Sequence, residues 1–312
     1  MMVIELARAC EQQKPWGVAD PRPWSEATQT GRSIGEISYE RKGPAASTPA
    51  LLLKVLLTSQ PLSIQVHPDD VFAQSIGLPN GKSEAWFVLS ACPGAAVALG
   101  LKHSVTPRQL RQAIDDGSIV DLVAWRNVVA GDAVFVPAGT IHAIGPGLVI
   151  AEIQQRSDAT FRLFDHGRNR ELHVDHAIAA ANPTPAARRL LPNHVNDGRR
   201  LLASNPHFVF ERLELEPDSS WRLDASRETW VFILNGGARV GDFDVVRGEA
   251  LFAQAERAEL RAGETGVVCL VGYTGDGGPL PQLLRRIEPK RTTNARHPGM
   301  DKAPGLSFRV GR

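Results

Sequence analysis

The sequence predicts a mainly β protein made of two related β units, and three observations support this. Short runs of β-branched, aromatic and aliphatic residues recur along the chain, separated by Gly, Pro and Asp. Helical periodicity is confined to one segment, near residues 103–126. The parts of the chain before and after residues 180–200 repeat each other's pattern. These features favour a sandwich or barrel over alternating βα units.

Several segments have the composition of β-strands. They read "LLLKVLL", "LSIQVH", "AWFVL", "AAVALG", "AVFVPA", "GLVIAEIQ", "TWVFIL" and "GVVCLVGY". The longest apolar run, "ALLLKVLL", carries Lys54 in its middle and is too short to span a bilayer.

One segment, "SVTPRQLRQAIDDGSIVDLVAW", has the signals of a helix instead. Thr106 is suited to the N-cap, Pro107 to the first helical position and Gly117 to the stop. Leu110 and Ile114 recur at helical spacing between them. We expect an insertion of one or two helices, which forms either a rim that excludes water or a packing layer.

The repeat defines two units joined by a linker. "KSEAWFVL" matches "SRETWVFIL", which aligns Glu84 with Glu228. Residues 180–200 are polar and rich in Pro, Ala, Arg and Asn, as linkers are. The predicted domains are therefore a catalytic unit at 1–190 and a second unit at 200–312.

Composition narrows the function classes. Charged residues are 22% of the chain and the net charge is +1, so we expect no nucleic-acid or membrane partner. The cysteines, Cys10, Cys92 and Cys269, are far apart, which favours a reducing compartment over a disulfide framework. The N-terminal residues lack the sustained apolar core of a signal peptide. These features predict a cytoplasmic protein.

Polar residues from separate predicted strands form a candidate metal site. Gln65 and His67 share one face of a short strand. Glu84 and His142 lie on two further strands, and two imidazoles, a carboxylate and an amide oxygen suit Zn²⁺. Each residue also has a structural interpretation, such as a core histidine or a salt bridge from Glu84 to Lys82.

The second unit lacks this set. Gln254, Glu256 and Glu259 stand where the first unit has a Pro-x-Gly-x-x-His pattern ending in His142. We therefore expect the second unit to be degenerate and to bind no metal.

The surroundings of His142 carry a family resemblance. Gly131, Pro137 and Gly139 precede it in "GDAVFVPAGTIH", which resembles the second conserved motif of the cupin superfamily. The resemblance implies two cupin-type β-barrels of the jelly-roll kind. Where general cupins begin their signature with His-x-His, this chain has Gln65-x-His67.

Longer stretches resemble type I mannose-6-phosphate isomerases, in particular the short bacterial form. They are "KPWG", "IGEISYE", "LLLKVLLTSQPLSIQVHPDD", "GKSEAWFVL" and "GDAVFVPAGTIHAIGPGLVIAEIQQRSDATFRLFDHGR", within residues 14–178. The resemblance implies interconversion of mannose 6-phosphate and fructose 6-phosphate through a cis-enediol. It also implies one Zn²⁺ per chain, held by Gln65, His67, Glu84 and His142.

The same resemblance suggests roles for other residues. Arg162, in the S-D-x-x-x-R pattern, corresponds to the catalytic arginine, and Ser63 and Arg168 to phosphate contacts, with Lys54 close by. The general base stays open between Glu152, Lys82, whose pKa a nearby metal could lower, and a metal-bound water.

Two other functions and two further features remain open at this stage. An iron-dependent cupin dioxygenase and a sugar-sensing cupin without catalysis are the alternatives to the isomerase. His166, His173 and His176 suggest either a second metal site or a polar rim. The second unit is available as a contact domain for a homodimer.

Overall fold

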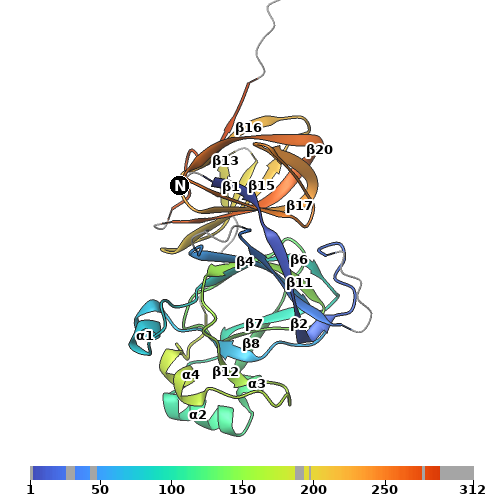
Figure 1. Ribbon diagram of the computed structural model, residues 1–312. Helices are drawn as coiled ribbons and strands as arrows, with labels where there is room; N and C mark the ends of the chain where they lie inside the picture. Colours follow the sequence, from blue (N-terminus) through green and yellow to red (C-terminus); the bar gives the residue numbers. More distant parts are fainter. Residues whose placement is uncertain are drawn as a thin grey trace, which may run out of the picture.

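The computed structural model describes residues 3–25, 32–42, 48–186, 193–196, 198–275 and 278–288. Strands dominate it and the helices are few and short, so the mainly β prediction is confirmed (Figure 1). The tail after Glu288 lies outside the described residues. In the described part of the chain, no helix has the length and apolar character needed to cross a membrane.

Two sheets form the first unit. The larger has the strand order β2-β3-β4-β11-β6-β9 and the smaller β12-β5-β10-β7-β8. The larger consists of β2 (Arg8–Val18), β3 (Ile34–Glu40), β4 (Leu51–Thr58), β6 (Glu84–Ala91), β9 (Ala133–Val136) and β11 (Leu148–Gln155). The smaller consists of β5 (Ile64–Val66), β7 (Ala96–Leu101), β8 (Val123–Asn127), β10 (His142–Ile144) and β12 (Phe161–Phe164).

The two sheets share one apolar cluster, in which Trp86 and Ile150 of the larger sheet meet Val97 and Ile144 of the smaller. They therefore face each other as the two layers of a jelly roll do. Among the described strands the pairing closes neither sheet into a barrel.

A ten-stranded sheet forms the second unit, with the main path β1-β19-β17-β20-β15-β14-β13. Its N-terminal strand β1 pairs with β19, so the start of the chain belongs to the sheet of the second unit. The predicted boundaries at 1–190 and 200–312 stay a prediction. The strands are β1 (Val3–Leu6), β13 (Asn193–Asn196), β14 (Arg199–Ser204), β15 (Phe208–Leu215), β16 (Ser220–Ala225), β17 (Thr229–Val240), β18 (Phe243–Val246), β19 (Ala250–Gln254), β20 (Glu256–Thr274) and β21 (Leu284–Arg286).

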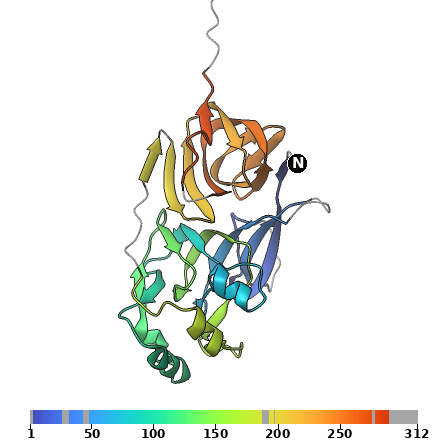
Figure 2. The ribbon, with the colours of Figure 1, turned by 90° about the vertical axis from the view of Figure 1, so that its left-hand side faces the viewer.

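The helices are α1 (Asp70–Ser75), α2 (Pro107–Asp115), α3 (Ile119–Leu122) and α4 (Val174–Ala180). The helices α2, α3 and α4 gather at the end of the first unit remote from the second unit (Figures 1 and 2), whereas α1 begins near the second unit, where Asp70 Oδ2 lies 3.9 Å from His207 Nδ1. The predicted insertion is confirmed: Thr106 and Gln109 form a capping box, and Pro107 opens the helix. Gly117, with φ of +78°, follows the end of that helix.

The sequence repeat corresponds to equivalent strands. In the first unit β6 pairs antiparallel with β9 and β11, and in the second unit β17 pairs with β19 and β20. The matched tryptophans Trp86 and Trp230 are both 1% exposed.

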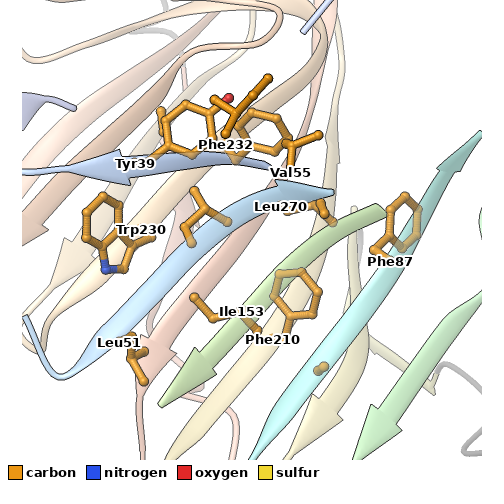
Figure 3. Close-up of a cluster of buried hydrophobic side chains, with 14 of the residues drawn as sticks. Tyr39, Leu51, Val55, Phe87, Ile153, Phe210, Trp230, Phe232 and Leu270 are labelled. Carbon is orange, nitrogen blue, oxygen red and sulfur yellow. The ribbon is translucent and has the colours of Figure 1, made fainter. Parts of the chain in front are cut away.

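A shared hydrophobic core joins the units (Figure 3). Strand β4 contributes Leu53 and Val55 to this core, whereas Lys54 and Leu56 point to the opposite face and line a cavity. The second unit therefore packs against the face of the larger sheet that is opposite to the cavity. The core side chains labelled in Figure 3 are Tyr39, Leu51, Val55, Phe87 and Ile153 from the first unit and Phe210, Trp230, Phe232 and Leu270 from the second.

Glu228, the repeat counterpart of Glu84, connects the units. Its carboxylate accepts hydrogen bonds from the backbone N–H groups of Ala50 (2.7 Å) and Leu51 (2.8 Å), at the start of β4. In the second unit the glutamate of the repeat thus holds a strand of the first unit.

Replacing Glu228 by alanine should therefore lower the free energy of unfolding by about 2–4 kcal/mol, because the buried Leu51 N–H loses its acceptor. Urea denaturation followed by circular dichroism measures the change. Glu264, an exposed carboxylate of the second unit, is the control, and Glu264→Ala should shift stability by less than about 0.5 kcal/mol. Equal losses in both variants would show that the contact with β4 is unimportant.

Candidate active site

A cavity of about 850 Å³ lies between the two sheets of the first unit. The site residues that the sequence predicted and that lie in its lining are all polar or charged. The predicted site residues in the lining are Lys54, Gln65, Lys82, Glu84, Glu152 and Arg162.

Strand register aligns part of the site on the smaller sheet. His142 of β10 lies opposite Gln65 of β5, and Gln65 lies opposite Arg162 of β12. Residues directly opposite in antiparallel strands have side chains on the same face. The three predicted residues therefore form a row across the sheet, although they lie far apart in the sequence.

The larger sheet supplies the facing row. Glu152 of β11 lies between Lys54 of β4 and Trp86 of β6 in the register. The indole Nε1 of Trp86 donates a hydrogen bond of 3.1 Å to Glu152 Oε1. Glu84 begins β6 and contacts His142 across the gap between the sheets.

His67, Glu84 and His142 form a group whose ligand atoms lie within 4.8 Å of one another. Nε2 of His67 is 3.4 Å from Glu84 Oε2, and Nε2 of His142 is 3.3 Å from Glu84 Oε1. Each of the three side chains is 1% exposed. It is the one such group found among the described residues.

Both imidazoles are oriented by their other nitrogen. Nδ1 of His67 donates to the carbonyl of Ala159 at 2.8 Å, and Nδ1 of His142 donates to the carbonyl of Thr140 at 2.8 Å. Each Nε2 therefore keeps its lone pair, which faces Lys82 Nζ at 3.2 Å in His67 and the Gln65 amide nitrogen at 3.2 Å in His142. Histidines that bind a metal are oriented through their other nitrogen in the same way. Burial, together with the nearby Lys82 charge, lowers the pKa of His67 to about 3, and burial also lowers the pKa of His142, so both rings are neutral.

The group has the ligand types that a divalent metal binds. Glu84 Oε2 is buried and accepts no hydrogen bond from the described residues, although it forms an ion pair with Lys82 Nζ at 3.1 Å. The Gln65 amide nitrogen is 3.2 Å from His142 Nε2, so a turn of the amide would place its oxygen beside the same centre. Two nitrogens and a carboxylate, with an amide oxygen in reach, match the ligands that Zn²⁺ takes.

Lys82 and Glu152 flank the metal group and differ in charge behaviour. Burial alone would lower the pKa of Lys82, but Glu84 and Glu152 outweigh burial and raise it, so Lys82 stays an ammonium. Burial and the neighbouring Glu84 raise the pKa of Glu152 to about 7. Burial would raise the pKa of Glu84, but Lys82 and His67 hold it well below its ordinary value.

Arg162 lies on the cavity wall, as predicted. Its Nη1 donates to the carbonyl of Glu171 at 3.2 Å, whereas its Nε is buried without an acceptor among the described residues. Its backbone is fixed by His173, whose Nδ1 accepts from the Arg162 N–H and whose own N–H donates to the Arg162 carbonyl.

The predicted phosphate contacts are placed in different ways. Lys54 lines the cavity and pairs with Glu36 at 3.8 Å. The Ser63 hydroxyl is buried and donates to Gln65 Oε1 at 2.9 Å, so it supports the Gln65 side chain. Arg168 is absent from the described lining, and its Nη2 donates to the carbonyl of Pro61 at 2.8 Å.

Residues that the sequence did not single out complete the lining. They include Lys14, Trp16, Glu36 and Arg170, and His173, which the sequence placed in a second metal site or a polar rim, also lines the cavity. Strand periodicity offers a signal for Glu36, which alternates with apolar Ile37 on β3. The "KPWG" motif held Lys14 and Trp16 but carried no assigned role.

The three histidines after β12 do not assemble into a second metal group in the described structure. His166 contacts the carbonyl of Leu62 at 3.0 Å, His173 fixes the Arg162 backbone, and His176 stacks on Phe161 with ring centroids 5.1 Å apart. Each of the three imidazoles therefore contacts a neighbouring backbone group or ring, and the three do not form a ligand set.

Known proteins resemble this chain in sequence and in fold. No family model matches the chain. The mannose-6-phosphate isomerase of Streptococcus mutans serotype c is 41% identical over 148 residues, covering 44% of this chain and 46% of that protein. The chain is similar to mannose-6-phosphate isomerases. This confirms the resemblance that its motifs suggested.

A second relative and a solved structure agree. Mannose-6-phosphate isomerase ManA of Bacillus subtilis strain 168 is 38% identical over 135 residues, covering 41% of this chain and 42% of ManA. The chain thus matches somewhat less than half the length of these curated relatives. The crystal structure of the Bacillus subtilis mannose 6-phosphate isomerase superposes with a TM-score of 0.76 at 21% identity, over 88% of this chain and all of that one. The common fold therefore extends well beyond the segment of sequence similarity.

Proposed function

We propose that this chain is a zinc-dependent aldose–ketose isomerase that interconverts mannose 6-phosphate and fructose 6-phosphate. The observation that carries the proposal is the buried group of His67, Glu84 and His142, of which Glu84 lines the same cavity as Arg162. The named relatives support the choice of substrate, since they are mannose-6-phosphate isomerases.

We assign one Zn²⁺ per chain to His67, Glu84 and His142, with Gln65 as the fourth ligand. When bound, Zn²⁺ supplies Lewis-acid polarisation of a substrate oxygen. The two neutral imidazoles and the single carboxylate leave such a site with net positive charge, which favours this chemistry.

The chain's own residues account for the proton transfer. Glu152 faces the cavity, is held by the Trp86 indole and adjoins the metal group, so we assign it as the base. It takes the proton from C2 of mannose 6-phosphate and returns it to C1, while a hydroxyl proton moves from O2 to O1 through the cis-enediol.

Two cationic side chains are assigned to the stabilisation of the negative charge that develops on the enediolate. Lys82 is a poorer base than Glu152, because its ion pair with Glu84 keeps it protonated. We assign its ammonium and the Arg162 guanidinium, which line the same cavity, to the stabilisation of the developing negative charge on oxygen. Lys54 is the predicted phosphate contact that lies on the cavity. The homodimer and the cytoplasmic location stay predictions.

Metal removal tests the proposal. The purified chain should convert mannose 6-phosphate to fructose 6-phosphate in a coupled assay, and dialysis against a chelator should reduce turnover by several orders of magnitude. Zn²⁺ should restore turnover, whereas Mg²⁺ should not, because nitrogen ligands disfavour it.

Other outcomes point to the alternatives. A fully zinc-loaded chain that binds the sugar phosphate without turnover would identify a sensor. Oxygen consumption by an iron-loaded chain would identify a dioxygenase.

A further inference from the structure

Two arginines follow β12 within one turn, and both contact Asp165 and lie over the Trp16 ring, but only Arg170 is among the described residues that line the cavity. Arg170 lines the cavity together with Arg162, whereas Arg168 does not. Arg168 instead ties the turn together, because its Nη2 donates to the Pro61 carbonyl at 2.8 Å and its Nε to Asp165 Oδ1 at 3.2 Å.

Arg170 is held in place from two sides. Its Nε donates to Asp165 Oδ2 at 2.7 Å and its Nη2 to Asp165 Oδ1, a bidentate pair with a carboxyl group that is 4% exposed. Its guanidinium lies 4.9 Å from the centroid of the Trp16 ring. Nη1 of Arg170 has no acceptor among the described residues.

Arg162 is close to this second guanidinium. Arg162 Nη1 contacts the carbonyl of Glu171, the residue that directly follows Arg170. Burial lowers the pKa of Arg162, and the charge of Arg170 lowers it further. Two cationic side chains on the lining of one cavity favour an anionic group in it, although Asp165 and Glu171 offset part of the charge on Arg162.

From this geometry we infer that Arg170, and not Arg168, binds the phosphate group of the substrate, that Asp165 and Trp16 position Arg170, and that Arg162 keeps its role at the enediolate oxygen. The inference rests on the proposed function of the cavity and names the residue that selects for a phosphorylated sugar. A phosphate oxygen pair matches the guanidinium of Arg170 in charge and in hydrogen-bonding geometry.

Arg170→Met in the zinc-loaded full chain tests the assignment. Calorimetry should show that the Kd for inorganic phosphate and for fructose 6-phosphate rises at least about tenfold, since one charge-assisted contact is lost. The KM for mannose 6-phosphate should rise by a similar factor while kcat changes less than about threefold. Unphosphorylated fructose should bind the variant and the parent chain equally.

Companion variants separate positioning from contact. Asp165→Asn keeps the shape of the side chain but removes its charge, and it should raise KM by a smaller factor with kcat unchanged. Arg170→Lys retains the positive charge and the folded turn, and it should give a KM between those of the parent chain and Arg170→Met. Arg108→Met, an exposed arginine of α2 outside the cavity, is the charge-matched control and should leave Kd and KM unchanged.

The outcomes distinguish a failure of the Arg170 assignment from a failure of the proposed isomerase reaction. Unchanged Kd and KM in both Arg170 variants, or a larger effect from Arg168→Met, would overturn the role of Arg170 while isomerase turnover persists. A parent chain that binds phosphate through Arg170 without any turnover would overturn the proposed reaction and leave the anion site standing.

Discussion

Arg162→Ala is expected to lower kcat by about 10²–10³-fold, the loss typical of removing one group that stabilises a developing oxyanion. Arg162 lies beside Gln65 in the strand register and on the cavity wall, but no ligand atom of the metal group belongs to it. The zinc content should therefore stay at the parent value. Steady-state kinetics and elemental analysis of the same preparation measure the two quantities.

The pattern across both cavity arginines makes this prediction specific. Loss of Arg162 should fall mainly on kcat, whereas loss of Arg170 should fall mainly on KM. Arg108→Ala on α2 serves as the control, with both parameters expected to match the parent chain. If Arg162→Ala changed only sugar-phosphate affinity and left kcat intact, the catalytic role of Arg162 would be wrong.

His142→Ala is expected to weaken zinc binding by more than about 100-fold, since losing a direct ligand exceeds the cost of losing its orienting partner. His142 Nε2 lies 3.3 Å from Glu84 Oε1, inside the candidate metal group. Isomerase turnover should fall with the zinc content.

The fold of this variant should persist. His142 sits at the start of β10, and its removal should cost about 1–3 kcal/mol of stability, the range for a buried polar truncation. Competition with a chromogenic chelator gives the zinc affinity, and thermal unfolding gives the stability. His176→Ala, which removes a ring stacked on Phe161, should keep full zinc content. A zinc-replete His142→Ala chain would remove His142 from the ligand set.

Local pattern is enough to predict the elements that carry the site. The alternation in "SIQVH" places Gln65 and His67 on one strand face, and the structure keeps both beside His142. The Thr106 cap and Gly117 stop likewise mark the helix, because caps and positive-φ glycines depend on neighbouring residues alone.

Contacts between segments that lie far apart in the sequence cannot be predicted from local sequence pattern. Arg168 and Arg170 are two residues apart in similar sequence surroundings, yet one braces a turn and the other lines the cavity. Ser63 supports Gln65, although the motif resemblance suggested a phosphate contact. In each case the partner lies on another strand or loop, so the packing of the sheets selects the role.

Short-range periodicity and motif chemistry were enough to predict several of the strands, the helical insertion, the residue types of the candidate metal site and the resemblance to an isomerase family. The folded chain was needed to show which side chains share the cavity and that the first strand pairs in the sheet of the second unit. It was also needed to show that the Glu228 carboxylate accepts hydrogen bonds at the start of β4. The physical reason is that burial and charge pairing are properties of atoms brought together from remote parts of the chain, whereas the alternation of a strand is a property of its own backbone.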